Sequence, residues 1–85
     1  MRLIQLLTQT NMQEIQFPLS TEYIDLLQLL KATSVVMSGG EAKHLVDDGF
    51  VTVNGEVELR RRRKLRLDDV VIFDEQIKIT LIKSE

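Results

Sequence analysis

Cysteine is absent from this 85-residue chain, and His44 is its only histidine. The fold therefore has no disulfide to stabilise it, and the thiolate and imidazole ligands of the usual transition-metal sites are missing. A chain of this length forms one domain at most and has little surface to spare for a substrate pocket. We therefore expect no catalytic activity and no metal, cofactor or small-molecule substrate.

Long apolar runs are missing as well. Hydrophobic residues make up 44% of the chain, but no run approaches the roughly 20 apolar residues of a membrane-spanning helix. Residues 1–8 are apolar in character, yet they are too few for a signal peptide and lack a small-residue cleavage site. We expect a cytoplasmic protein that does not act on membranes.

Aromatic residues are few, with no Trp, one Tyr and three Phe. None of them lies in the densest block of charge, Arg60-Arg61-Arg62-Arg63-Lys64-Leu65-Arg66, which we call the basic run. Proteins that bind single-stranded nucleic acid combine cations with aromatic side chains on which the bases stack. Stacking on single-stranded bases is therefore not the expected mode of binding.

The basic run holds six of the 11 Lys and Arg residues of a chain with 13 Asp and Glu residues and a net charge of −2. The remaining chain has five positive residues against those 13 acids, a net charge of −8. A run of like charge is often a solvated loop or an interaction tail, because it repels itself unless an opposite charge meets it. The usual opposite charge for arginine is phosphate, since the guanidinium fork bonds two phosphate oxygens at once.

Residues 20–33 predict a first helix. Ser20 or Thr21 can cap its start, because a hydroxyl oxygen accepts a free N–H group of the first turn. Its apolar residues recur at helical spacing and are expected in the core; they are Tyr23, Leu26, Leu27 and Leu30. Lys31 falls in the last turn.

Ser38-Gly39-Gly40-Glu41 is a capping box that predicts a second helix over about residues 39–48, ended by Gly49 in a left-handed conformation. Its buried stripe is expected to be Ala42, Leu45 and Val46. The two glycines exceed what capping needs and cost about 1 kcal/mol each relative to alanine. They allow close backbone approach, so a phosphate could lie there with Lys43 one turn along. The simpler alternative is a capped helix start without a ligand.

The rest of the chain predicts strands. Residues 13–17 alternate polar and apolar and predict a short edge strand closed by Pro18. Asn54-Gly55 predicts a hairpin between strands at 50–53 and 56–59. Two more strands are expected at 70–73 and 76–82, with turns at Asp68-Asp69 and Asp74-Glu75. The fold class is therefore α+β, with two short helices packed on a small, mostly antiparallel sheet. Residues 1–12 stay ambiguous between a short helix, an extra strand and a frayed end.

The joint pattern resembles the S-four domain, the RNA-binding fold named after small-subunit ribosomal protein four, and most closely the small stand-alone bacterial proteins that consist of little else. The matching pieces are Leu29-Leu30-Lys31, Ser38-Gly39-Gly40-Glu41-Ala42-Lys43, Gly49-Phe50-Val51-Thr52-Val53-Asn54-Gly55-Glu56-Val57-Glu58, Arg63-Lys64-Leu65 and Asp69-Val70-Val71. The likeness runs from about residue 22 to residue 74. It implies the alpha-L motif of that domain over residues 20–85, preceded by an N-terminal extension, residues 1–19, that could hold an edge strand.

The resemblance also implies RNA held across the second helix and the basic run. The helical side consists of Lys31, Ser38, Gly39, Gly40, Lys43 and His44, and the other side of Arg60, Arg61, Arg62, Arg63 and Lys64, to which the charge pattern adds Arg66. Two positions depart from the family. Many S-four domains have Arg where Gly39 stands, and the family's Gly-Asp before the next strand is Asp68-Asp69 here.

We expect a non-catalytic protein that recognises structured RNA, ribosomal or transfer, by shape and phosphate contacts, in association with the ribosome. If all six cations of the basic run engaged phosphates, the log–log salt slope of binding would be about −4 to −5. One alternative is a protein-interaction module whose basic run docks on an acidic partner. Duplex DNA is a third candidate ligand, because phosphate contacts carry little sequence information.

Overall fold

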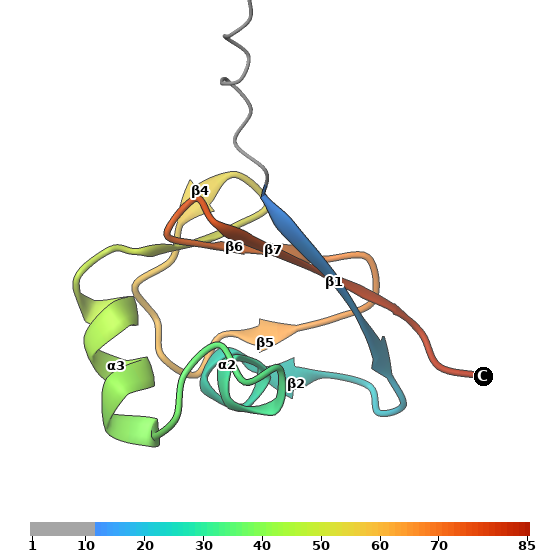
Figure 1. Ribbon diagram of the computed structural model, residues 1–85. Helices are drawn as coiled ribbons and strands as arrows, with labels where there is room; N and C mark the ends of the chain where they lie inside the picture. Colours follow the sequence, from blue (N-terminus) through green and yellow to red (C-terminus); the bar gives the residue numbers. More distant parts are fainter. Residues whose placement is uncertain (1–11) are drawn as a thin grey trace, which may run out of the picture.

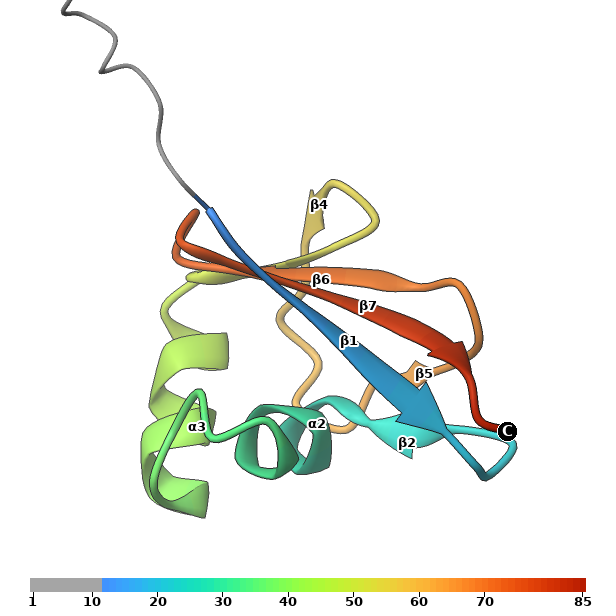
Figure 2. The same cartoon turned by 45° about the vertical axis from the view of Figure 1, so that its right-hand side comes forward.

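The computed structural model of the protein describes residues 12–85, so the expectation for residues 1–11 lies outside the described part. Its elements are β1 (Gln13–Leu19), β2 (Ile24–Asp25), α2 (Leu26–Ala32), α3 (Gly39–Asp47), β3 (Val51–Val53), β4 (Glu56–Val57), β5 (Lys64–Leu65), β6 (Val70–Phe73) and β7 (Ile77–Lys83). The two helices lie on one side of the larger sheet (Figures 1 and 2). This arrangement confirms the predicted α+β fold.

The larger sheet has the strand order β1-β7-β6-β3-β4, and β2 pairs with β5 in a separate ribbon. The β1–β7 pair is parallel, and the other pairs within residues 12–85 are antiparallel. The core lies between sheet and helices, and among residues 12–85 it contains ten fully buried side chains: Leu26, Leu29, Leu30, Ala42, Val46, Val51, Leu65, Val71, Ile79 and Leu81. A single apolar layer therefore fixes both helices, the sheet and, through Leu65, the end of the basic run.

The strand predicted at residues 13–17 is present and continues through Pro18 to Leu19, so Pro18 does not close it. It lies at the edge of the sheet beside β7, where Pro18 is opposite Ile82. A proline without an N–H group is tolerated on an edge strand, because one side of that strand has no neighbour to bond. The division of the chain at residue 19 stays a prediction.

The first helix begins at Leu26, six residues later than predicted. Asp25 is its N-cap, and its side-chain oxygen accepts the backbone N–H of Gln28 at 2.8 Å. Ile24 and Asp25 are extended because they pair with Leu65 and Lys64 of β5. Tyr23 consequently lies outside the helix and is 42% exposed, so its predicted place in the core was wrong.

The second helix agrees with the prediction to within one residue. Ser38 Oγ accepts the N–H of Glu41 at 3.1 Å, and the Glu41 carboxylate accepts the N–H of Met37 at 2.9 Å. At the other end Gly49 has a φ of +82°, and the following N–H of Phe50 bonds the carbonyl of Leu45. A hydrogen bond back to the last turn of the helix is typical of a helix that ends at a glycine in the left-handed conformation.

The predicted hairpin is also present, and Asn54 and Gly55 both have positive φ. Its second strand ends at Val57 rather than at residue 59. Glu58 still donates its backbone N–H to Val51, but its side chain is buried and faces the basic run. The strand therefore ends where the chain turns to form the site.

Candidate nucleic-acid interface

The basic run begins with a turn and continues as a strand. The N–H of Arg63 bonds the carbonyl of Arg60 at 3.3 Å, and Lys64–Leu65 then forms β5 against β2. The carbonyl of Arg63 accepts the N–H of Leu26, the first residue of α2. The basic run is thus an ordered segment attached to the start of α2, and not a solvated tail.

Glu58 is the carboxylate at the centre of this turn, and it is only 6% exposed. It accepts the Nε–H of Arg60 at 2.9 Å and an Nη–H of Arg63 at 2.6 Å. It also accepts the backbone N–H of Arg60. These bonds, those of Arg60 first, lower the pKa of Glu58 from its ordinary value of 4.5 to about 2 and raise that of Arg60. Glu58 is therefore charged at neutral pH and holds two of the four consecutive arginines.

Arg61 is held by the second helix. Its Nε and Nη2 atoms donate to the two carboxylate oxygens of Asp47 at 2.9 and 2.6 Å, which is the paired geometry that a guanidinium fork favours. This pairing lowers the pKa of Asp47 and raises that of Arg61. Asp47 therefore links α3 to the basic run.

The two remaining arginines have longer contacts. Arg62 Nε lies 3.4 Å from Asp25, and Arg66 Nη1 lies 3.4 Å from Glu22. Arg62 is 80% exposed. Each arginine of the basic run thus has an internal carboxylate partner, so a phosphate backbone is not needed to offset its charge.

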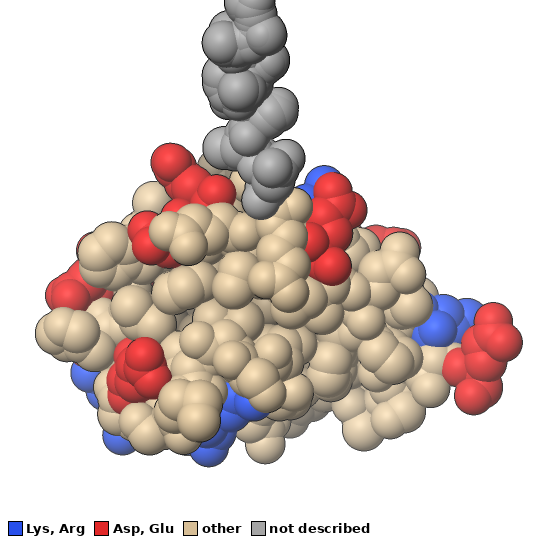
Figure 3. Space-filling model, in the orientation of Figure 1, with Lys and Arg blue, Asp and Glu red and all other residues tan. Residues whose placement is uncertain are grey.

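Lys31, Lys43 and Lys64 have no carboxylate within ion-pair distance among residues 12–85. Lys31 and Lys43 line a groove of about 340 Å³, which we call the cationic groove; its lining is Asp25, Leu27, Gln28, Lys31, Gly39, Lys43 and Arg62. Lys64 lines an adjoining hollow with Arg60, Arg62 and Arg63. On the face drawn in Figure 3, Lys and Arg side chains are visible along the lower left edge, and acidic side chains lie mainly near the upper edge, with groups of both signs at the right.

Gly39 is the first residue of α3 and leaves the groove floor free of a side chain. A Cβ atom added there would lie 4.0 Å from Lys31 Nζ, an ordinary contact distance. The ammonium of Lys31 therefore lies directly over the start of the second helix. This geometry brings Lys31, Gly39, Lys43 and Arg62 together, from three separate parts of the sequence.

The other predicted residues on the helical side lie elsewhere. The hydroxyl of Ser38 caps the second helix, and Gly40 lies next to that hydroxyl rather than in the groove. His44 is 77% exposed, and its Nε2 lies 3.0 Å from Asp48. None of the three lines the cationic groove.

Tyr23 was missed as a member of the site. Lys64 Nζ lies 4.8 Å from the centroid of its ring, and the guanidinium carbon of Arg66 lies 5.7 Å away. Although no aromatic residue interleaves with the basic run in sequence, one packs against it in space. Its position just before the Asp25 helix cap was the available signal, because a residue preceding an N-cap is extended and not part of the helix face.

The carboxylate partners were missed too. The signal for them was the net charge of −8 outside the basic run, which provides ample internal counter-charge. Which carboxylate lies beside which arginine, however, is known only from distances in the folded protein. Glu22 and Arg66 are 44 residues apart in sequence.

Comparison with known proteins agrees with this architecture. The family model described as "S4 domain" matches residues 17–81. The probable ribosome maturation protein RlbA of Bacillus subtilis (strain 168) is 47% identical over 53 residues, which cover 62% of this chain and 75% of that protein. The crystal structure of the 30S ribosomal protein S4e from Thermoplasma acidophilum superimposes with a TM-score of 0.55 at 18% identity, and the match covers 65% of this chain and 29% of that one.

The described part of the chain contains no helix that is long and apolar enough to cross a membrane. The match at residues 17–81 covers most of the chain and contains both helices, the basic run and the cationic groove. It confirms the resemblance drawn from the sequence, and the chain belongs to the S4 domain family.

Proposed function

We propose that the protein binds structured RNA, with the RNA backbone in the cationic groove. The observation that carries this proposal is the convergence of Lys31, Lys43 and Arg62 around Gly39, whose missing side chain lets a phosphate approach the helix backbone. The two lysines have no carboxylate partner within residues 12–85, so a phosphate can bind them without first breaking an ion pair.

In this proposal most arginines of the basic run are structural. Arg60, Arg61 and Arg63 hold Glu58 and Asp47 at 2.6 to 2.9 Å. The phosphate contacts then come from Lys31, Lys43, Lys64 and the exposed Arg62. Four contacts give a log–log salt slope of about −3, shallower than the slope expected if every cation of the basic run were engaged.

The role that fits best is non-catalytic binding of ribosomal RNA during ribosome maturation, in the cytoplasm. It is supported by membership of the S4 domain family and by the printed name of the Bacillus subtilis relative. Ribosomal RNA is favoured over transfer RNA by that relative alone. The alternative from the sequence is docking on an acidic protein through the same groove. In that case the protein would not distinguish RNA from DNA.

The test is a fluorescence-anisotropy titration of the protein with an RNA hairpin and the DNA hairpin of the same sequence, at salt concentrations from about 50 to 200 mM. We expect tighter binding to RNA, because a 2′-hydroxyl distinguishes the two sugars. Replacing Lys31 and Lys43 together by alanine should make the slope shallower by about 1.5.

The matched control replaces Lys78 and Lys83, two cations of β7, by alanine. It removes the same charge away from the groove and should keep the slope of the unmodified protein. Equal losses in both double variants would contradict the proposed groove, and equal affinity for RNA and DNA would contradict a preference for RNA. Binding to neither hairpin would favour a protein partner.

A further inference from the structure

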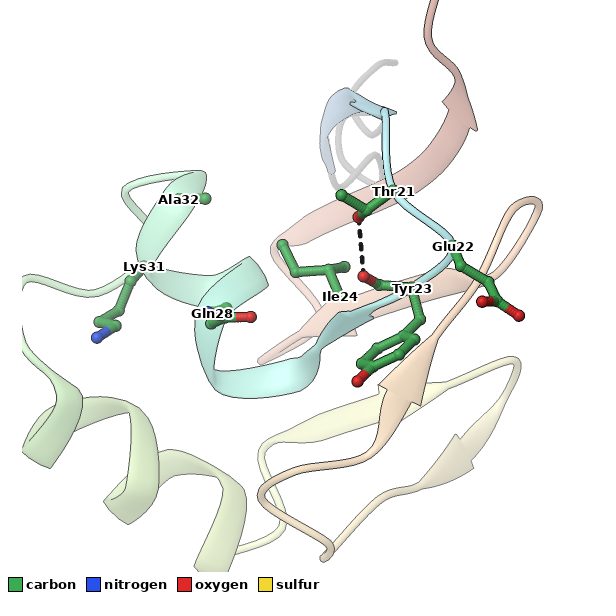
Figure 4. A pocket seen from close by; sticks show the side chains of 7 residues that line it. All are labelled: Thr21, Glu22, Tyr23, Ile24, Gln28, Lys31 and Ala32. Carbon is green, nitrogen blue, oxygen red and sulfur yellow. Dashed lines mark hydrogen bonds between the residues drawn. The ribbon is translucent and has the colours of Figure 1, made fainter.

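A second hollow opens beside the cationic groove. Its volume is about 670 Å³, within the range of small-molecule sites, and its lining is Thr21, Glu22, Tyr23, Ile24, Gln28, Lys31 and Ala32. Tyr23 and Ile24 stand on the β2 side, and Gln28, Lys31 and Ala32 lie along α2 (Figure 4). Gln28 and Lys31 also line the cationic groove, so the two spaces are neighbours on α2.

The wall made by Tyr23 is aromatic, exposed and fixed in place. The ring is held by Lys64 and Arg66, at 4.8 and 5.7 Å from its centroid. Its backbone carbonyl accepts the hydroxyl of Thr21 at 2.9 Å. An aromatic surface that is already ordered favours stacking of a nucleobase, because little side-chain entropy is lost on binding.

The opposite wall offers hydrogen bonds. The side-chain amide of Gln28 makes no hydrogen bond within residues 12–85, and its backbone N–H donates to the side chain of Asp25. A glutamine amide has a donor and an acceptor side by side, the pair that matches N6 and N7 of adenine. Gln28 can therefore read a base edge while Lys31, on the same helix, meets the adjacent phosphate.

The charges around the hollow determine whether the base or the phosphate of a nucleotide binds there. Glu22 lines the hollow, and its carboxylate lies 3.4 Å from the guanidinium of Arg66, which is a long distance for an ion pair. A weakly paired carboxylate repels a phosphate but tolerates a neutral base. The cationic groove next to it is lined by three cations against one carboxylate, that of Asp25, so its net charge favours a phosphate.

We propose that this hollow holds one unpaired adenine of an RNA whose backbone lies in the cationic groove. This inference rests on the proposed function and adds a base-specific site to it. Such an adenine would be bulged or looped out, because a paired base presents neither its face nor its full edge to a protein.

The test uses the single tyrosine of the chain. Protein labelled with 3-fluorotyrosine gives one ¹⁹F resonance, from Tyr23, which RNA signals do not obscure. It is titrated with three hairpins that are identical except for a bulged adenosine, a bulged uridine or no bulge. We expect the adenosine bulge to shift the resonance most and to bind about tenfold more tightly than the unbulged hairpin, as stacking of one base allows.

Gln28→Ala should abolish the preference for adenosine over uridine, measured as the ratio of the affinities for the two bulged hairpins. Gln16→Ala, on the exposed edge strand β1, is the matched control and should keep the preference. If all three hairpins bind equally and shift the resonance equally, the adenine site is wrong while the proposed function stands. If none of them binds, both are wrong.

Discussion

Glu58 accepts a hydrogen bond of 2.6 Å from the guanidinium of Arg63, five residues further along the chain. Because the same carboxylate also holds Arg60, a nearly buried acid fixes the turn that begins the basic run. The backbone carbonyl of Arg63 in turn accepts the first N–H of α2. The pair therefore positions the basic run beside the cationic groove.

Replacing Glu58 by glutamine should lower the free energy of unfolding by about 2 kcal/mol. The amide lacks the charge and presents an NH2 group to the arginines, so a charge-assisted hydrogen bond is lost at a buried position. Urea unfolding measures the loss. Glu56→Gln, on the exposed strand β4 two residues earlier, should unfold like the unmodified protein. Equal stability of the Glu58 and Glu56 variants would show that the buried carboxylate contributes nothing.

The unfolding free energy should depend on acid pH through the same residue. The pKa of Glu58 is lowered from 4.5 to about 2 in the folded protein, chiefly by its hydrogen bonds with Arg60. A lowered folded pKa stabilises the protein above the unfolded pKa, and this stabilisation disappears as the pH falls from about 4.5 to about 2. The loss should be about 3 kcal/mol in that window.

Urea unfolding at a series of pH values tests this dependence. Glu58→Gln should flatten the curve, because it removes the titrating group. Asp47, whose pKa is also lowered, should leave a smaller dependence of the same sign in that variant. A variant curve as steep as the original would assign the acid sensitivity to other carboxyl groups.

Removing the partner of Arg61 should strengthen RNA binding. Asp47→Asn abolishes the ion pair whose shortest contact is 2.6 Å, and a released Arg61 can then meet a phosphate. We expect higher affinity and a salt slope steeper by about 0.8, in anisotropy titrations. Asp48→Asn is the control, since Asp48 contacts His44 and pairs with no arginine of residues 12–85. If both variants gain affinity equally, general loss of negative charge explains the effect.

Gly39→Ala should separate stability from binding. The new Cβ would be 4.0 Å from Lys31 Nζ and needs no rearrangement, while alanine is the better helix residue by up to about 1 kcal/mol. The variant should therefore unfold at the same or a higher urea concentration but bind RNA more weakly, because the methyl group keeps a phosphate from the helix backbone. Gly40→Ala, in the same turn but outside the groove, should keep its affinity. Unchanged affinity of Gly39→Ala would exclude a phosphate at that point.

The two helices show how much of the fold can be predicted from the sequence. The second was predicted to within one residue because its signals are local: Ser38 and Glu41 cap one end and Gly49 closes the other. The first was predicted to begin six residues too early, because Tyr23 fits helical spacing while the pairing of Ile24 and Asp25 with β5 depends on a segment far along the chain. Local hydrogen bonds are legible in a sequence, and competition from a distant strand is not.

The site shows the same limit. The sequence predicted Lys31, Gly39, Lys43 and Arg62 as part of a larger set of RNA-binding residues, and the fold brings these four together. It could not tell these from Arg60, Arg61 and Arg63, since charge alone does not reveal which guanidinium faces a carboxylate. Glu58 could be recognised only once its side chain was seen to be buried, at the point where β4 leaves the sheet.

An NMR titration of backbone amides with an RNA hairpin tests whether RNA lies in the cationic groove. We expect the amides of β1 and β4 to stay unchanged and the shifts to gather at Lys31, Gly39, Lys43 and Arg62. Shifts confined to β1, β4 or the β6–β7 turn, with the groove amides unmoved, would contradict that placement of the RNA.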